Sequence, residues 1–381
     1  MSKLDDLIKE KCPNGVKYEC VGSIADVGTG SSNGNEAIDN GEYPFFVRSQ
    51  TVKAKNDYEY DEEAIIIPGE GGIGDIYHYV NGKYALHQRV YRIHFKDDRI
   101  NTRFMYYCFS AFFKRFILKK AVSATVTSIR KPMIEKFEVP IPPLEVQNEI
   151  VQILDNFAEL TAELTAELSN RKKQYEYYRD LLLDFDENEQ RERGVRWVSI
   201  EDICEISRGF VMSKDFIRDN AGEYPVYSSQ TENNGMLGCI NTYKYDGDYL
   251  TWTTDGANAG TVFRRSGKFS VTNVCGLLKV KDSTVSNDYL YYILSNTAKN
   301  YVNSGMGNPK LMSNVMARIK VPIPDNKEQQ RIVDVLDRFD KLTSDISEGL
   351  PAEIEAREKQ YAYYRDKLLL FKELETEMKN A

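Results

Sequence analysis

Apolar residues recur at helical spacing in two long stretches of the chain. They stand at Ile150, Leu154, Phe157, Leu164 and Leu168 in the first stretch, and at Ile332, Leu336, Phe339, Ile346 and Ile354 in the second. Spacings of three, four, seven and eight residues place apolar side chains on one face of a helix. Each stretch follows a VPIP sequence, whose prolines end an incoming strand. The pattern therefore predicts two long amphipathic helices.

The two stretches are copies of each other. Val139–Phe157 (VPIPPLEVQNEIVQILDNF) matches Val321–Phe339 (VPIPDNKEQQRIVDVLDRF), and Gln174–Leu183 (QYEYYRDLLL) matches Gln360–Leu369 (QYAYYRDKLL). At about 1.5 Å per residue each helix would be about 65 Å long, too long to be buried by its own globular half. We therefore expect the helices to pack against each other as an antiparallel coiled coil, with the second one broken near Gly349–Pro351.

The sequence before each helix is also duplicated, more weakly. Val16–Gly30 parallels Val195–Gly209, and alternating β-forming residues surround Asn81-Gly82 and Ser266-Gly267, which predicts a hairpin turn at each dipeptide. A further helix is expected from Phe104 in one half and from Tyr289 in the other.

The fold class that follows is α+β, with two duplicated β-rich domains, each followed by a long helix, and pseudo-two-fold symmetry. The expected boundaries are 1–143 for the first domain, 144–194 for the central helix and linker, 195–324 for the second domain and 325–381 for the C-terminal helix.

Composition is that of an ordinary water-soluble chain, with 41% hydrophobic and 28% charged residues. The N-terminus, MSKLDDLIKE, lacks the features of a signal peptide, and no stretch is apolar enough to span a bilayer, so a cytoplasmic location with no membrane partner is expected. The net charge of -8 at first argues against a nucleic-acid partner. The acidic excess lies on the two helical segments, however, and the globular halves are near neutral, which permits a local basic surface.

Sequence motifs of catalysis and cofactor binding are missing or out of context. Gly69–Gly74 satisfies GxGxxG but leads into the alternating segment DIYHYV, so no helix N-terminus is expected there to hold a phosphate, and flexible turn backbone is the better interpretation. No GxxxxGK[ST] sequence and no Asn-Pro-Pro-aromatic tetrapeptide of amino-methyltransferases occur. The six cysteines and three histidines lack metal-ligand spacing, and we expect no metal site and no catalytic site in this chain.

The repeated blocks resemble the specificity (S) subunit of a type I restriction-modification system along essentially the whole chain. The resemblance rests on the VPIP and QYxYYRD blocks with their second copies, and on KYALHQRVYRI and KFSVTNVCGLLKV in the globular halves. It implies two target-recognition domains that each read one half of a split double-stranded DNA site with a fixed spacer. It also implies two methylation subunits that use S-adenosylmethionine at adenine N6, and restriction subunits that use ATP and Mg.

Candidate DNA-contacting residues follow from the chemistry of readout. Forked donors such as Arg, Asn and Gln reach base edges, while Lys, Arg and hydroxyl groups on loops bind phosphates. The candidates in the first half are Arg48, Ser49, Gln50, His87, Gln88, Arg89, Thr127, Arg130 and Lys131. Those in the second half are Arg208, Ser229, Gln230, Arg264, Arg265, Thr272, Asn273 and Lys310. Any single member has an alternative role as a solvated surface charge or a turn residue, so the prediction rests on the set.

A short tandem repeat lies within the central helix. Thr161-Ala-Glu-Leu164 is followed directly by Thr165-Ala-Glu-Leu168, which makes this segment a candidate ruler for the spacer between the half-sites, against the alternative of favourable helix filler. Two other classes of function stay open at this point. They are a coiled-coil scaffold with two β-rich ligand-binding modules, and a self-sufficient DNA-modifying enzyme, which the missing motifs disfavour.

Overall fold

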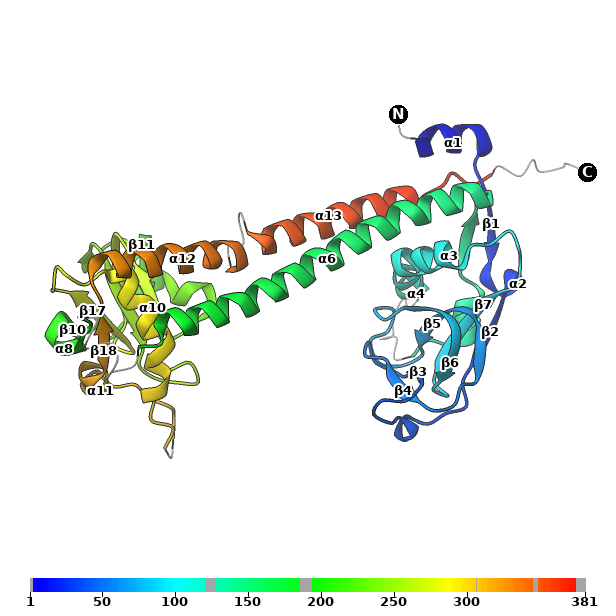
Figure 1. Cartoon of the computed structure of the whole chain (residues 1–381). Helices are drawn as coiled ribbons and strands as arrows, with labels where there is room; N and C mark the ends of the chain where they lie inside the picture. Colours follow the sequence, from blue (N-terminus) through cyan, green and yellow to red (C-terminus); the bar gives the residue numbers. More distant parts are fainter. Residues whose placement is uncertain (1–2, 121–127, 186–193, 306, 345–348, 375–381) are drawn as a thin grey trace, which may run out of the picture. The chain divides into compact units, whose positions relative to one another are not determined.

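The structure is a computed structural model that describes residues 3–120, 128–185, 194–305, 307–344 and 349–374. It divides into two compact units (Figure 1): the first unit comprises residues 1–165 and 353–381, and the second unit comprises residues 166–352. Within the described residues, no helix combines the length and the apolar character needed to cross a membrane.

The first unit is built around a six-stranded sheet in the order β2-β7-β5-β6-β3-β4. These strands are β2 (Ala25–Thr29), β3 (Tyr43–Phe46), β4 (Lys53–Lys55), β5 (Tyr60–Pro68), β6 (His78–Leu86) and β7 (Val90–Phe95). All neighbours pair antiparallel except β3 and β6, which are parallel. Strand β5 lies inside the sheet, and its run Ala64–Ile67 is fully buried. Ile65 and Ile67 belong to one apolar cluster, and Ala64 and Ile66 belong to another.

Helices and a second, two-stranded sheet complete the first unit. They are α1 (Lys3–Lys11), α2 (Val21–Ile24), the short η1 (Gly34–Glu36), α3 (Thr102–Cys108), the π-helical segment η2 (Phe109–Phe113), α4 (Lys114–Lys120) and α5 (Lys131–Glu135), with β1 (Lys17–Cys20) paired to β8 (Glu138–Ile141). The helix expected from Phe104 is confirmed, and Phe104 and Met105 of α3 pack in the same cluster as Ile65 and Ile67.

The second unit repeats this plan with its strands divided between two four-stranded sheets, in the orders β10-β17-β14-β15 and β12-β11-β16-β13. The strands are β10 (Cys204–Arg208), β11 (Ala221–Tyr227), β12 (Met236–Ile240), β13 (Tyr245–Asp246), β14 (Tyr249–Thr253), β15 (Val262–Arg265), β16 (Lys268–Val271) and β17 (Cys275–Val280). A separate pair joins β9 (Arg196–Ser199) to β18 (Lys320–Ile323). The helices are α8 (Ile200–Ile203), α9 (Lys214–Asp219), η3 (Glu232–Gly235), α10 (Asn287–Thr297), η4 (Ala298–Tyr301), α11 (Ser313–Arg318) and α12 (Asn326–Ser344), and α10 confirms the helix expected from Tyr289.

The duplication extends to backbone contacts. A Cβ atom on Gly30 would lie 1.8 Å from the carbonyl oxygen of Leu86, and one on Gly209 would lie 1.9 Å from that of Val271. Strand β3 pairs in parallel with the segment ending at Leu86, and β11 pairs in parallel with the segment ending at Val271. Only glycine allows such close approach of two backbones, which explains why both copies of the weak repeat end in glycine.

Both predicted hairpin turns are wrong. Strand β6 runs without interruption through Asn81-Gly82, where Glu63 and Glu62 of β5 lie opposite these two residues. At Ser266-Gly267 the chain leaves β15, which pairs with β14, and enters β16, which pairs with β11 and β13 in the other sheet. Gly82 and Gly267 have positive φ values of 115° and 75°, which glycine adopts readily, but Gly82 lies within a strand and Gly267 lies between strands of two different sheets.

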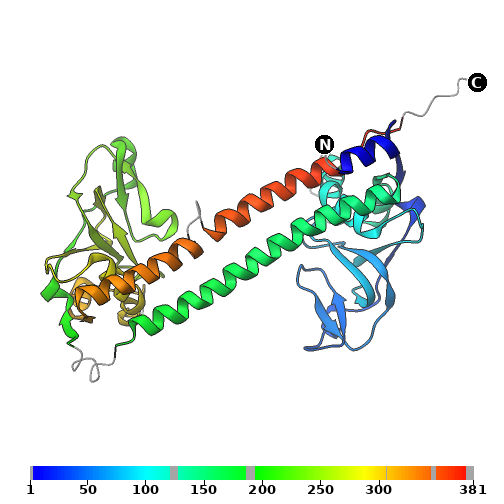
Figure 2. The ribbon, with the colours of Figure 1, turned by 45° about the horizontal axis from the view of Figure 1, so that its top comes forward.

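The long helices form as predicted, and the second one is divided. Helix α6 spans Leu144–Leu183, while the second copy consists of α12 and α13 (Leu350–Leu368), with Gly349 outside both and Pro351 in the first turn of α13. Ile346 lies outside the described residues. In the first unit the start of α6 lies antiparallel beside α13, and in the second unit the end of α6 lies antiparallel beside α12 (Figure 2).

The two helix pairs are built from exchanged copies of the repeat. In the first unit Phe157 stacks on Tyr364, with ring centroids 5.6 Å apart, and in the second unit Phe339 stacks on Tyr178 at the same distance. Phe157 and Phe339 are equivalent positions of the VPIP block, and Tyr178 and Tyr364 are equivalent positions of the QYxYYRD block. Each unit therefore combines the first block of one copy with the second block of the other.

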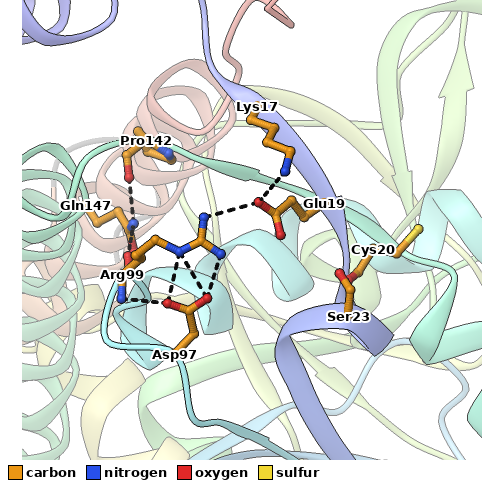
Figure 3. Close-up of polar contacts among 8 residues, drawn as sticks. All are labelled: Lys17, Glu19, Cys20, Ser23, Asp97, Arg99, Pro142 and Gln147. Atoms are coloured by element: carbon orange, nitrogen blue, oxygen red, sulfur yellow. Dashed lines mark hydrogen bonds and ion pairs between the residues drawn. The ribbon is translucent and has the colours of Figure 1, made fainter.

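A buried glutamine connects each helix to its globular part. Gln147 is fully buried and donates through Nε2 to the carbonyl oxygens of Arg99 (2.8 Å) and Pro142 (2.7 Å) (Figure 3). Its Oε1 accepts from the backbone N–H of Asn101 at 2.9 Å. Gln329 makes the equivalent bonds to the carbonyls of Thr284 and Pro324 and from the N–H of Ser286. Asn101 and Ser286 are the N-cap residues of α3 and α10, so each glutamine fixes where α3 or α10 begins relative to the long helix.

Candidate nucleic-acid interface

A hollow of about 470 Å³ lies in the first unit where β5 ends. The backbone N–H of Gly69, just after β5, donates to the carbonyl of Arg89 (2.9 Å), and the N–H of Ile129 donates to the carbonyl of Gly69 (2.7 Å). These bonds bring together three segments that are far apart in the sequence. The side chains that line the hollow include Glu70, Gln88, Arg89, Arg130 and Lys131.

The charges around this hollow are organised by one carboxylate. Nη1 of Arg89 lies 2.7 Å from Oε1 and 2.9 Å from Oε2 of Glu70, and Nη1 of Arg48 lies 3.2 Å from Oε2. The hydrogen bond from Arg89, and then that from Arg48, lower the pKa of Glu70, so the carboxylate is ionised at neutral pH. Both arginine side chains stay about half exposed, at 57% for Arg89 and 49% for Arg48, and so remain accessible to a ligand.

His87 and Gln88 shape the loop that carries Arg89. His87 is buried, and its Nδ1 accepts a hydrogen bond from the backbone N–H of Arg89 at 3.0 Å. Burial, followed by the positive charges of Arg48 and Arg89, lowers the pKa of His87, which favours the neutral imidazole that this contact requires. The Gln88 amide donates to Oδ1 of Asn33 at 2.8 Å. His87 therefore holds the backbone at Arg89 in place from a buried position.

The second unit carries a hollow of about 740 Å³ at the equivalent place. Thr254, just after β14, donates its N–H to Val274 (3.2 Å) and accepts from the N–H of Leu311 (3.0 Å), which are the counterparts of the bonds at Gly69. The lining includes Asp255, Asn303, Asn308, Lys310 and Asn314. The Lys310 ammonium lies 3.5 Å from the Asp255 carboxylate. Beside the hollow, Nε of Arg208 donates to the Ser313 hydroxyl at 3.1 Å.

The structure thus gathers part of the predicted set into two surfaces. Arg48, Gln88, Arg89, Arg130 and Lys131 lie in or beside the first hollow, and Arg208 and Lys310 lie in or beside the second. Ser49 and Gln50 are exposed next to Arg48, and the Ser49 hydroxyl donates to the carbonyl of Thr51. Thr127 lies outside the described residues.

Two predicted arginines of the second half make internal contacts instead. Arg264 is ion-paired with Asp288 (3.1 Å) and Asp337 (2.9 Å) and stacks over Tyr291. Arg265 is 3% exposed, with its guanidinium 3.6 Å from the centre of the Tyr227 ring and its Nε donating to the Thr251 hydroxyl. A base contact from Arg265 would require this side chain to leave its buried position, so we leave both arginines out of the interface proposed below.

The other predicted residues of the second half lie near the end of β16 and in the loop after β11. Thr272 is buried and donates to the Ser228 hydroxyl at 3.1 Å, while Asn273 is exposed. Ser229 and Gln230 are half-buried, and the Gln230 amide donates to the carbonyl of Met236.

Sequence reasoning missed the two acids, Glu70 and Asp255. Each comes two residues after the last residue of a buried central strand, and the backbone bonds at Gly69 and Thr254 show that their positions are equivalent. An alignment of the two halves at these strands could have revealed them. In the described part of the chain, no group of three or more His, Cys, Asp or Glu side chains is placed to hold a metal ion.

Comparison with known proteins agrees with this architecture. The family of type I restriction modification DNA specificity domains matches residues 13–172 and again residues 192–356. The chain is 44% identical over 236 residues to a putative type I specificity subunit of Mycoplasma pneumoniae, covering 61% of this chain and 92% of that protein. It is 36% identical over 268 residues to the specificity subunit of the type I restriction enzyme EcoR124I/EcoR124II of Escherichia coli, covering 64% of this chain and 65% of that subunit.

A solved structure has the same fold. The S subunit of a type I restriction-modification system from M. genitalium superposes with a TM-score of 0.63 at 17% identity, covering 94% of this chain and 98% of that one. The family match covers most of the chain in two copies, and these copies coincide with the two duplicated globular parts and their helices. The chain therefore belongs to the family of DNA specificity subunits of type I restriction-modification systems.

Proposed function

We propose that the two hollows read the two halves of a split double-stranded DNA sequence whose spacer has a fixed length. The observation that carries this proposal is the equivalent placement of the hollows, one in each copy of the specificity domain, both at the end of the central strand and both lined by cations and by amide groups. Amide and guanidinium groups are the side chains that discriminate base edges in the major groove.

Phosphate contacts would come from exposed cations at the rims. Arg130 and Lys131 are exposed beside the first hollow, and Lys310 is 52% exposed at the second. Such contacts position a protein on DNA without selecting a sequence, and they make its affinity depend on salt. The net charge of -8 does not oppose this arrangement, because the acidic excess lies on the helical segments.

Specificity subunits of type I systems are the non-catalytic members of their complexes, and catalysis belongs to the methylation and restriction subunits. We propose that this chain binds two methylation subunits through the exposed faces of its duplicated helices, where Tyr177 and Tyr363, equivalent positions of the two copies, are 64% and 62% exposed. S-adenosylmethionine, ATP and Mg would then be bound by the partners. Because the complex would act on host DNA, we propose a cytoplasmic location for it.

Methylome sequencing tests the proposed function directly. A host that expresses this chain with its methylation subunit is expected to carry N6-methyladenine at a split motif, and omission of either gene is expected to abolish that modification. A modified motif that persists without this chain would overturn the proposal.

Binding measurements on the assembled complex test the phosphate contacts. Arg130→Ala is expected to weaken binding to all sequences and to lower the slope of log affinity against log salt by roughly one unit. Lys136→Ala is the matched control, because Lys136 is an exposed cation at the other end of α5 and does not line the hollow. Equal effects of the two substitutions would remove Arg130 from the interface.

A further inference from the structure

Each hollow contains a carboxylate where the proposed function requires attraction to a polyanion. Glu70 lines the first hollow and Asp255 lines the second, at equivalent positions two residues after the central strand of each unit. A carboxylate that faces DNA opposes phosphate binding and so weakens the affinity that is independent of sequence. The presence of an acid at both positions indicates a role other than phosphate attraction.

The geometry in the first unit suggests what that role is. Glu70 engages Nη1 of Arg89 and Nη1 of Arg48, so among the described residues its contacts occupy neither Nη2 nor Nε of either guanidinium group. The carboxylate limits the rotamers of two long side chains that are about half exposed. A guanidinium held by a carboxylate on one edge presents its other edge in a defined direction, and a paired fork matches the O6 and N7 acceptors of guanine.

The second unit has an aspartate at the equivalent position, and its partner is a lysine instead of two arginines. Asp255 accepts from the Thr254 hydroxyl at 2.6 Å and lies 3.5 Å from the Lys310 ammonium. Lys310 and Asp255 also face each other in an isolated antiparallel backbone bridge, which fixes the start of the lysine side chain. Lysine donates as a point charge and lacks the planar fork of arginine. A carboxylate is thus present at the equivalent position of both units, whereas the cation that it contacts is arginine in the first unit and lysine in the second.

We propose that Glu70 and Asp255 are positioning residues for base readout, which hold Arg48 with Arg89, and Lys310, against purine acceptors in the first and second half-sites respectively. This inference rests on the proposed function and extends it to specificity. The carboxylates lower the attraction of each surface for phosphate and orient its cations, so they raise discrimination between sequences at the cost of general affinity. Because Arg48 and Arg89 are forked and Lys310 is not, the contacted purine position is read more strictly in the first half-site.

The test replaces each acid by its amide in the complete complex with the methylation subunits. Glu70→Gln is expected to reduce discrimination at one position of the first half-site by roughly tenfold or more, while affinity for a duplex of unrelated sequence rises. The second half-site is expected to stay unchanged. Asp255→Asn is expected to give the converse result, with relaxation confined to the second half-site. For both variants, discrimination is measured from the methylated motif and from binding to duplexes with single base-pair changes.

Asp97→Asn serves as the matched control. Asp97 accepts hydrogen bonds from the guanidinium of Arg99 (Figure 3), and these bonds chiefly lower its pKa. The hollow lies at the start of β7, whereas Asp97 follows the end of that strand. This substitution is expected to leave the motif and the affinity for unrelated DNA unchanged.

The outcomes separate the inference from the proposed function. A relaxed first half-site in Glu70→Gln with raised affinity for unrelated DNA supports the inference. An unchanged motif with unchanged discrimination overturns it while leaving the proposed function intact. Loss of affinity for every sequence in Glu70→Gln also overturns it, because that result indicates a structural role for the acid. Absence of any split motif in the wild-type complex refutes the proposed function itself.

Discussion

Replacing Gln147 with leucine is expected to destabilise the first unit selectively. The side chain is fully buried and makes three hydrogen bonds, to the carbonyls of Arg99 and Pro142 and from the N–H of Asn101. Leucine has a similar size and restores none of these bonds. Because Asn101 caps α3, the loss acts at the point where that helix meets α6.

The size of the effect follows from how deeply each bond is buried. The bond to Pro142 is buried, and the other two are partly buried. A buried group left without its partner costs about 1 to 3 kcal/mol, and a partly buried group costs less because water can reach it. The sum gives a loss of about 2 to 4 kcal/mol from the free energy of unfolding of the first unit. Gln329→Leu is expected to cause a similar loss in the second unit.

Hydrogen exchange in increasing urea measures the stability of each unit separately. In Gln147→Leu, the amides of α3 are expected to exchange at lower urea than in the wild type, while those of α10 keep their wild-type midpoint. Gln152→Leu is the control, because Gln152 is exposed on the same helix and an exposed substitution usually changes stability by no more than about 0.5 kcal/mol. A loss below about 1 kcal/mol for Gln147→Leu, or an equal loss in both units, would refute the reasoning.

Three further predictions concern the helix repeat, the histidines and Arg264. Inserting a third Thr-Ala-Glu-Leu unit after Leu168 lengthens the helix by about 6 Å and turns it by about 400°, which is one full turn plus about 40°. One added base pair rotates B-DNA by a similar angle, about 34 to 36°. The methylated motif is therefore expected to gain about one base pair of spacer, with both half-sites unchanged. An active variant that keeps its original spacing would contradict this. Burial lowers the pKa of His78 and, together with neighbouring cations, that of His87, so the unfolded chain binds protons at higher pH than the folded chain. The first unit is therefore expected to lose stability as pH falls below about 6.5. The second unit contains no histidine, and equal losses in thermal melts of the two units would contradict this assignment. Arg264→Ala leaves Asp337 without its guanidinium partner and is expected to cost the second unit about 1 to 3 kcal/mol in urea unfolding, whereas no loss would show that the pair contributes nothing to stability.

The duplicated architecture could be predicted from the sequence because its signals are local and repeated. Helical periodicity, the prolines before each helix and the Gly349–Pro351 break correspond to observed boundaries. The strand pairing could not be predicted from alternation and a turn dipeptide, because a glycine inside a strand or between two sheets has the same local sequence as one in a hairpin turn. At Asn81-Gly82 the pairing with β5 continues through the dipeptide, and this pairing is a tertiary property.

The candidate interface could be predicted only in part, because the contacts that each side chain makes inside the folded protein are also a tertiary property. Residue type identifies groups that can contact DNA, but it does not show which of them are already used inside the protein. Arg264 and Arg265 are adjacent in the sequence, yet one pairs with acids from two helices and the other stacks on Tyr227. Glu70 was overlooked because a single acid after a strand has no distinctive pattern until the arginines beside it are placed.

The exchange of blocks between the units determines the order in which the chain can fold during synthesis. The second unit is contiguous, residues 166–352, whereas the first unit also needs residues 353–381. Leu369 is fully buried in the core of the first unit, and the carbonyl of Lys372 accepts the N–H of Val16. The half that leaves the ribosome first therefore has to wait, with part of its apolar core uncovered, until the last segment has emerged. A message truncated just after residue 352 would yield a complete second unit attached to an unfinished first one, and the unfinished unit would be the target of chaperones and proteases.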